Sequence, residues 1–122
     1  LIPDSGGTWW LPRLVGMQRA KALAFFGDKL TAQDAMNMGL IYKAVSEEAF
    51  LAEIEATATR LSEMPTYALG LTKAAFHKGM NSDLDEQLDL ELDYQFRAAE
   101  SEDYAEGVAS FLEKRAPKFI GK

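Results

Sequence analysis

The chain has 122 residues, of which 48% are hydrophobic and 26% are charged, and its formal net charge at pH 7 is −6. Length and composition fit one soluble globular domain, no apolar run approaches the ~18 residues of a membrane-spanning helix, and the acidic balance argues against a general nucleic-acid binder. The chain contains no cysteine, which excludes disulfides and thiolate metal sites. We therefore expect a cytoplasmic protein that binds a small molecule.

The first third of the chain is predicted to form short helices followed by one strand. Thr8, preceded by two glycines, starts a short helical run that Gly16 closes. Residues 17–26 are predicted to form an Ala-rich helix, and residues 31–39 a further one with a threonine cap and a glycine stop. The run LIYKAVS, residues 40–46, is apolar and β-branched and is predicted to be a strand.

Longer helices are predicted from Ser46 onward, because Ser46 is a natural N-cap. Pro65 interrupts the chain before a helix over residues 66–79. Asp83 then opens a long helix whose apolar residues lie both on one stripe and off it, and such a helix is usually sandwiched between layers or subunits. The stripe consists of Leu84, Leu88, Leu92, Phe96 and Ala99, and the off-stripe residues are Leu90 and Tyr94. The last helix is expected to bury a face made of Tyr104, Val108, Phe111 and Leu112.

Asp4 is the first residue with candidate chemistry, because it stands between a proline and a Ser-Gly-Gly turn. Pattern alone favours a helix N-cap or a turn carboxylate. The alternative is a general base, since a free aspartate has a pKa near ~3.9 and is ionised at neutral pH. The apolar neighbours Trp9, Trp10 and Leu11 could desolvate the carboxylate and raise its basicity. The two tryptophans are more often core packing than a ligand platform.

The basic end of the chain is the second candidate site. Lys114, Arg115 and Lys118 could hold a phosphate through charge-assisted hydrogen bonds. Cations near a helix C-terminus also simply complement the helix dipole, which is the more frequent role. No metal site is predicted, because the acidic run has no accompanying ligand pattern and the single histidine, His77, is expected to be a helix-end residue.

Three stretches taken together resemble the C-terminal half of the crotonase (enoyl-CoA hydratase/isomerase) superfamily. They are IPDSGGTWWLPRLVG, ALAFFGDKLTAQDAMNMGLIYKAV and SEDYAEGVASFLEKRAPKFIGK, in the family's order and spacing along essentially the whole chain. The stretch LIPDSGGTWWLPR together with LDLELDYQ is most similar to the ring-opening epoxide isomerases of phenylacetate degradation. The resemblance implies a mainly α chain, the C-terminal helical trimerisation part of a crotonase-like α/β fold, with the ββα spiral core missing.

The resemblance also assigns roles to residues. Isomerases of the superfamily place an aspartate where Asp4 stands, which implies Asp4 as the catalytic base. It implies an acyl pocket lined by Trp9, Trp10 and Leu11, and CoA phosphates held by Lys114, together with Lys118, from a neighbouring subunit. Residues 1–45 would end the core domain, with its active-site turn and the strand-like run. Residues 46–122 would form the helical oligomerisation region.

The expected function is isomerisation of an acyl-CoA thioester by proton transfer through an enolate whose oxygen is held by N–H donors. The substrate would carry a ring epoxide or a movable double bond, in phenylacetate or fatty-acid degradation. Two alternatives stay open: an enoyl-CoA hydratase of the same superfamily, and a non-catalytic helical interaction module. No cofactor is expected, because coenzyme A is part of the substrate. The expected partners are the acyl-CoA and further copies of the chain, as a trimer or a dimer of trimers, with no nucleic acid and no membrane. The isolated stretch is expected to be an inactive fragment.

Overall fold

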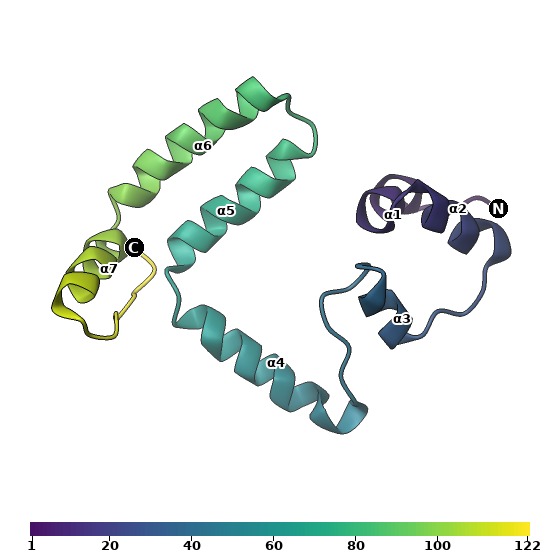
Figure 1. Ribbon diagram of the computed structural model, residues 1–122, viewed down its shortest axis with the longest axis horizontal. Coiled ribbons are helices and arrows are strands. Elements are labelled where there is room, and N and C mark those ends of the chain that lie inside the picture. The colour runs from purple at the N-terminus through teal and green to yellow at the C-terminus, as the bar shows by residue number, and fades with distance from the viewer. The chain divides into compact units, whose positions relative to one another are not determined.

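The computed structural model describes all 122 residues and contains seven helices and no strand (Figure 1). It divides into two compact units, Leu1–Phe50 and Leu51–Lys122. The mainly helical fold predicted from the sequence is confirmed. No helix combines the length and the apolar composition that crossing a bilayer requires.

The first unit contains α1 (Gly7–Val15), α2 (Met17–Phe26) and α3 (Ala32–Asn37). Helices α1 and α2 pack against each other across Gly16, whose φ of 82° and ψ of 156° lie in a region that residues with a Cβ rarely adopt. The small core of this unit consists of Val15, Ala20 and Ala35. The predicted helix at residues 17–26 and the stop at Gly16 are confirmed.

Helix α3 begins where its cap was predicted. The Thr31 Oγ1 atom accepts a hydrogen bond from the backbone N–H of Asp34 at 3.1 Å and donates one to the Asp34 carboxylate at 2.6 Å. This exchange satisfies one of the N–H groups that a helix start leaves free. Gly39 follows the helix with a φ of 81°, as expected of a glycine stop.

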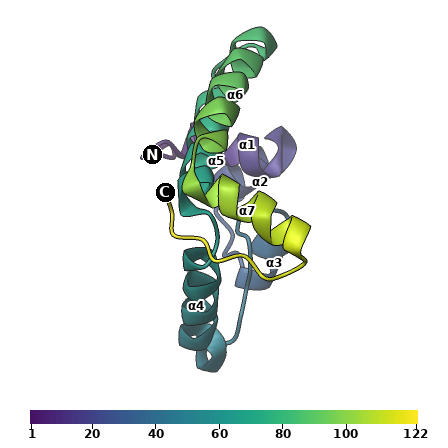
Figure 2. The ribbon, with the colours of Figure 1, turned by 90° about the vertical axis from the view of Figure 1, so that its left-hand side faces the viewer.

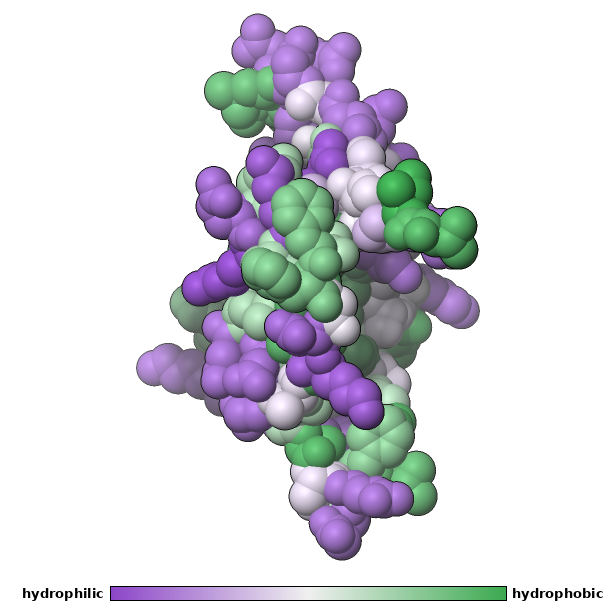
Figure 3. Space-filling view, turned by 90° about the vertical axis from the view of Figure 1, so that its right-hand side faces the viewer, coloured by the Kyte–Doolittle hydropathy of each residue, from purple (hydrophilic) through white to green (hydrophobic).

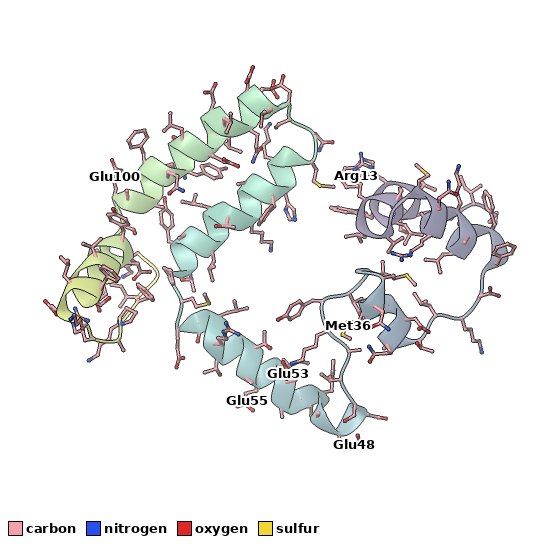
Figure 4. All side chains as sticks on the ribbon, viewed as in Figure 1. Arg13, Met36, Glu48, Glu53, Glu55 and Glu100 are labelled. Carbon is pink, nitrogen blue, oxygen red and sulfur yellow. The ribbon has the colours of Figure 1, made fainter.

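The strand predicted at residues 40–46 is wrong, because the structure forms no strand there. The segment instead bonds to the helix before it: the backbone N–H of Leu40 donates to the Ala35 carbonyl at 2.9 Å, and that of Ala44 donates to the sulfur of Met36 at 3.4 Å (Met36 is labelled in Figure 4). A strand is stabilised by pairing with another strand, and residues 1–122 contain none.

The second unit consists of four helices: α4 (Glu47–Ser62, which begins just before the unit boundary), α5 (Thr66–Gly79), α6 (Leu84–Ala99) and α7 (Glu102–Glu113). Helix α6 packs against both α5 and α7, and Figure 1 shows α5 and α6 side by side. The predicted starts are confirmed, since Ser46 Oγ accepts from Ala49 N–H and an Asp83 carboxylate oxygen accepts from Glu86 N–H. The break at Pro65 also stands where it was expected.

The face that α7 was expected to bury is exposed, and the buried residues of this helix are polar. Tyr104 and Phe111 are 55% and 82% exposed, whereas Asp103 and Ser110 are 2% and 3% exposed. The prediction failed because amphipathic spacing locates an apolar face without supplying a partner for it. On another face of the molecule, Figure 3 also shows hydrophobic side chains at the surface among hydrophilic ones.

The apolar stripe of α6 is exposed as well. Its off-stripe residues Leu90 and Tyr94 are half-buried, and Gln87 Nε2 on α6 donates to the Ala75 carbonyl of α5 at 3.2 Å. The stripe has the opposite character: its large side chains, Leu84, Leu88, Leu92 and Phe96, are between 51% and 71% exposed. One side of α6 is therefore packed and the other is open within this unit.

Candidate functional site

Asp4 precedes α1 in a tight turn that exposes its carboxylate. The backbone N–H of Gly7 donates to the Asp4 carbonyl at 2.7 Å, and the two residues between them are left-handed, with φ of 52° at Ser5 and 81° at Gly6. Two left-handed central residues are the pattern of a type I′ turn. The turn places Asp4 immediately before the helix and outside its hydrogen-bonded ladder.

The Asp4 side chain does not cap the helix. The N-cap residue of α1 is Gly6, without a side-chain hydrogen bond. The Asp4 carboxylate is exposed and has no hydrogen bond or ion pair. The N-cap interpretation of Asp4 is therefore wrong, and its oxygens are free to accept a proton from another molecule.

The two tryptophans lie beside this turn rather than in a core. A Cβ atom placed on Gly6 would lie 3.2 Å from Cδ1 of Trp10, so the indole rests on the turn itself. Trp9 is half-buried, Trp10 is 46% exposed, and Leu11 is half-buried. The two indoles meet edge to face, with centroids 4.4 Å apart and an angle of 84° between their planes. The first turn of α1 thus offers an apolar surface close to the carboxylate.

Arg13 is a site residue that the sequence interpretation missed. Its guanidinium carbon lies 3.9 Å from the Trp9 ring centroid, and its Nη1 donates to the Trp9 carbonyl at 2.9 Å (Figure 4). The Trp-x-x-x-Arg spacing could have revealed this contact, because residues four apart are neighbours on a helix surface and guanidinium groups stack on aromatic faces. Arg13 fixes the orientation of Trp9.

At the other end of the chain, the three basic residues have different roles. Arg115 donates from Nη1 and Nη2 to the Glu106 carboxylate at 2.5 and 2.8 Å, and from Nε to Glu113 at 2.6 Å. These bonds raise the pKa of Arg115, and the Arg115 guanidinium, with the Lys118 N–H, lowers the pKa of Glu106 to about 2. Arg115 is already paired within the chain. The prediction that it would share a phosphate with the lysines is therefore not supported.

The two lysines form no salt bridge. Lys114 ends α7 in the left-handed region, with a φ of 55°, and its side chain is exposed and without a partner. Lys118 donates its backbone N–H to Glu106 at 2.7 Å, and its ammonium group interacts with the Glu106 carboxylate at longer range without forming a salt bridge. Two ammonium groups near the end of α7 are thus available to an anion.

Asp103 is a second residue that the sequence interpretation missed, although it is the third residue of the SEDYAEG stretch. It is 2% exposed, and its two carboxylate oxygens accept hydrogen bonds from the backbone N–H groups of Ile120 at 2.6 Å and Gly121 at 2.9 Å. Its own N–H donates to the Lys122 carbonyl at 2.9 Å. No local pattern shows these bonds, because they join residues 17 to 19 positions apart.

The candidate residues fall into two groups. Asp4, Trp9, Trp10 and Leu11 lie together at the start of α1 in the first unit, and Lys114 and Lys118 lie at the end of α7 in the second. His77 lies in the last turn of α5, as expected of a helix-end residue. Among the candidate residues, the structure therefore leaves the Asp4 carboxylate accessible in the first unit and the two lysine ammonium groups accessible in the second.

Comparison with known proteins assigns the chain to a family. The description of the enoyl-CoA hydratase/isomerase family matches residues 1–122. The chain is 48% identical over its whole length to the 1,2-epoxyphenylacetyl-CoA isomerase of Escherichia coli K12, and covers 47% of that protein, its C-terminal half. It is 47% identical to a probable enoyl-CoA hydratase of Rhodobacter capsulatus, of which it covers 48%.

A solved structure shows the same fold. The enoyl-CoA hydratase subunit I of Geobacillus kaustophilus HTA426 superposes with a TM-score of 0.94 and 38% identity, covering all of this chain and 48% of that one. The chain thus spans about half the length of the curated relatives it matches. The resemblance drawn from the sequence motifs is confirmed, and the chain belongs to the enoyl-CoA hydratase/isomerase (crotonase) family.

Proposed function

We propose that the protein is an acyl-CoA isomerase in which Asp4 carries the proton. The observation on which this rests is the exposed, unbonded carboxylate of Asp4, held by a left-handed turn at the start of α1. A carboxylate with no internal partner can accept a proton without first breaking a bond to the protein. The 48% identity to an epoxyphenylacetyl-CoA isomerase over the whole chain supports the same choice.

The proposed reaction proceeds through an enolate of the thioester. Asp4 removes a proton from the carbon α or γ to the carbonyl, the electron pair moves onto the thioester oxygen, and the proton returns at the other carbon. Carboxylates are weak bases, so the step needs N–H donors that hold the developing oxyanion. In the family pattern those donors lie in a segment other than the one matched by residues 1–122. For a ring epoxide, Asp4 would assist ring opening within the same CoA thioester.

We propose that Trp9, Trp10 and Leu11 line the acyl end of the substrate. Their apolar surface lies beside the turn that carries Asp4, since the Trp10 indole rests on Gly6. Water excluded by these side chains would raise the basicity of the carboxylate when substrate is bound. The Arg13 contact that orients Trp9 would keep this surface in one shape.

We propose that Lys114 and Lys118 bind the phosphate end of coenzyme A. Their ammonium groups form no salt bridge, whereas Arg115 is held by two glutamates. A cytoplasmic location is proposed from the composition alone. We also propose that the protein acts as a homo-oligomer, because the apolar stripe of α6 lies open in its unit. The test is sedimentation of the wild type and of the Leu88→Asp, Leu92→Asp variant. The variant should shift to a smaller species, and an unchanged species would remove the stripe from the interface.

Hydration is the second candidate, because the chain is also 47% identical to a probable enoyl-CoA hydratase and 38% identical to a crotonyl-CoA hydratase. A hydratase adds water across the 2,3-double bond of the thioester, whereas an isomerase moves a double bond without adding atoms. The two reactions are separated by mass, since only the hydrated product gains a water. The third possibility, a helical module without catalysis, predicts no turnover and no affinity for coenzyme A.

The decisive experiment uses the product of the full open reading frame that encodes residues 1–122. Isomerisation of a 3-enoyl-CoA is followed by the absorbance of the conjugated thioester in the wild type and in Asp4→Asn. The variant should lose about 10²–10⁴-fold in rate, the range for removal of a general base. Asp28→Asn is the matched control, because Asp28 is another exposed carboxylate of the same unit without a bond. Equal rates in wild type and Asp4→Asn would exclude Asp4 as the base.

A further inference from the structure

The last eight residues of the chain form a segment that turns back along α7. We call residues 115–122 the C-terminal strap. The strap has no regular secondary structure, and Figures 1 and 2 show it leaving the far end of α7 and returning beside that helix. A segment without regular secondary structure is mobile unless something binds its backbone. Two carboxylates of α7 do so.

Asp103 is the inner anchor of the strap. It is the most buried residue named above, at 2% exposure, and both of its oxygens are used by strap N–H groups, those of Ile120 and Gly121. A carboxylate buried to this degree is costly unless it is fully hydrogen-bonded, and hydrogen bonds to an ionised acceptor are stronger than neutral ones. The strap therefore supplies the hydrogen bonds that the buried Asp103 carboxylate needs, and Asp103 in turn holds the strap against α7.

Glu106 is the outer anchor. It lies three residues further along α7, on the same face of the helix, and accepts the backbone N–H of Lys118 at 2.7 Å together with two bonds from Arg115. The backbone is thus held at Lys118 itself and again two residues later at Ile120. Glu113 also bonds Arg115, but it accepts no backbone N–H group of the strap.

A glycine at position 121 allows the strap to lie this close to α5. Gly121 has a φ of 78°, and a Cβ atom there would overlap the Thr66 Oγ1 atom at the start of α5. A Cβ atom on Gly107 would come into ordinary contact with the Phe119 ring, 3.7 Å away. The strap is consequently seated between α7 and the first residue of α5, with its register set by Asp103 and Glu106.

We propose that Asp103 and Glu106 are positioning residues that hold the strap so that the Lys118 ammonium group stands ready for the phosphate end of a CoA thioester. This inference rests on the proposed function. Glu106 pairs with Arg115, and the anchors fix the backbone of Lys118 while its ammonium group, which interacts with Glu106 only at longer range, forms no salt bridge. A lysine whose backbone is already held in place loses less conformational entropy when an anion binds. This preorganisation increases the affinity for the anion without adding a contact.

The test compares Asp103→Asn and Glu106→Gln with the wild-type product of the full open reading frame. Glu113→Gln is the matched control, because it removes a bond to Arg115 without touching the strap backbone. Two quantities are measured: amide exchange at Lys118, Ile120 and Gly121, and the dissociation constants of coenzyme A and of 3′-dephospho-coenzyme A. Turnover of a 3-enoyl-CoA gives KM and kcat.

Both anchor variants should speed amide exchange in the strap. They should also weaken the binding of coenzyme A about tenfold and barely change the binding of 3′-dephospho-coenzyme A. They should raise KM and leave kcat within about twofold, and Glu113→Gln should match the wild type. If Asp103→Asn does not fold, Glu106→Gln decides the question, since Glu106 is near the surface.

Three results would overturn the inference. Faster strap exchange with unchanged coenzyme A affinity would make the strap purely structural. If the wild type bound coenzyme A and 3′-dephospho-coenzyme A with equal affinity, Lys118 would have no role in binding the phosphate. Turnover of the 3-enoyl-CoA in that case would show that the proposed function still stands. Absence of both binding and turnover in the wild type would instead overturn the proposed function, and this inference with it.

Discussion

Two aspartates of this chain, Asp4 and Asp103, are used in opposite ways. Asp4 stands in an exposed turn before α1 and has no bonding partner. Asp103 lies in the first turn of α7, is 2% exposed, and has both oxygens occupied by backbone N–H groups. The same functional group is left available in one unit and fully used in the other.

The difference separates a candidate reacting group from a structural one. A carboxylate that reacts must have oxygens that can accept a proton, and the free energy of folding should depend little on it. A carboxylate that holds the chain should contribute to stability and be unable to react, because its lone pairs are already shared. The following predictions test whether the two aspartates divide their roles in this way.

The largest expected effect is on the stability contributed by Asp103. Asp103→Ala should lower the free energy of unfolding by about 3 kcal/mol, because two buried N–H groups lose a charged acceptor. Asp4→Ala should change it by less than about 0.5 kcal/mol, as exposed substitutions without contacts usually do. Urea titrations of both variants measure the difference. Equal losses would mean that the contrast between the two aspartates does not extend to energetics.

The next effect concerns the seat of the strap against α5. Gly121→Ala should lower the free energy of unfolding by about 2 kcal/mol, because the alanine would adopt a left-handed conformation and its Cβ atom would overlap Thr66. Gly27→Ala should cost only about 1 kcal/mol, since Gly27 is also left-handed but a Cβ atom there meets nothing. Adding Thr66→Ala to Gly121→Ala should recover about half of the loss in thermal denaturation. Without such recovery, the strap would not be seated on Thr66.

A smaller effect, of opposite sign, is expected at Lys114. This residue is left-handed at the end of α7, where glycine is preferred. Lys114→Gly should therefore stabilise the protein by about 1 kcal/mol while weakening coenzyme A binding. Lys114→Ala removes the same charge but keeps the Cβ atom, so it should weaken binding without stabilising. A lysine whose replacement improved stability and left binding unchanged would have no role at the proposed site.

The smallest effect is the pH dependence contributed by Glu106, whose pKa falls from 4.5 to about 2 on folding. A lowered folded pKa means that the stabilisation is complete above about pH 4.5 and is lost as the pH falls toward 2. The stability difference between wild type and Glu106→Gln should therefore shrink across that range. The pair with Arg115 lies near the surface, so added salt should reduce the difference too. A pH-independent difference would contradict this origin.

Much of the secondary structure was predictable because helix ends depend on local chemistry. Thr31, Ser46 and Asp83 each accept a hydrogen bond from an N–H group three residues ahead, so a cap and its partner are visible in one short stretch. Pro65 stops a helix through its own ring and missing N–H. The family was predictable for a different reason, namely that its motifs are continuous along the chain.

The errors arose where the outcome depends on a distant partner. Residues 40–46 have the composition of a strand, but no second strand in the chain pairs with them. Helix α7 has an apolar face by spacing, but the side that is covered is the one that faces the strap. Asp4 could be singled out from its neighbours, whereas the importance of Asp103 could not, because it has no local partner.

By itself, the sequence determined the helices, the family and the identity of the candidate base. Only the tertiary structure decided which charged groups are already paired and which remain available. The physical reason is range. A cap or a turn is formed within about four residues, but the bonds that use up Asp103 and Glu106 join residues 9 to 19 positions apart, and they exist only after the strap has folded back onto α7.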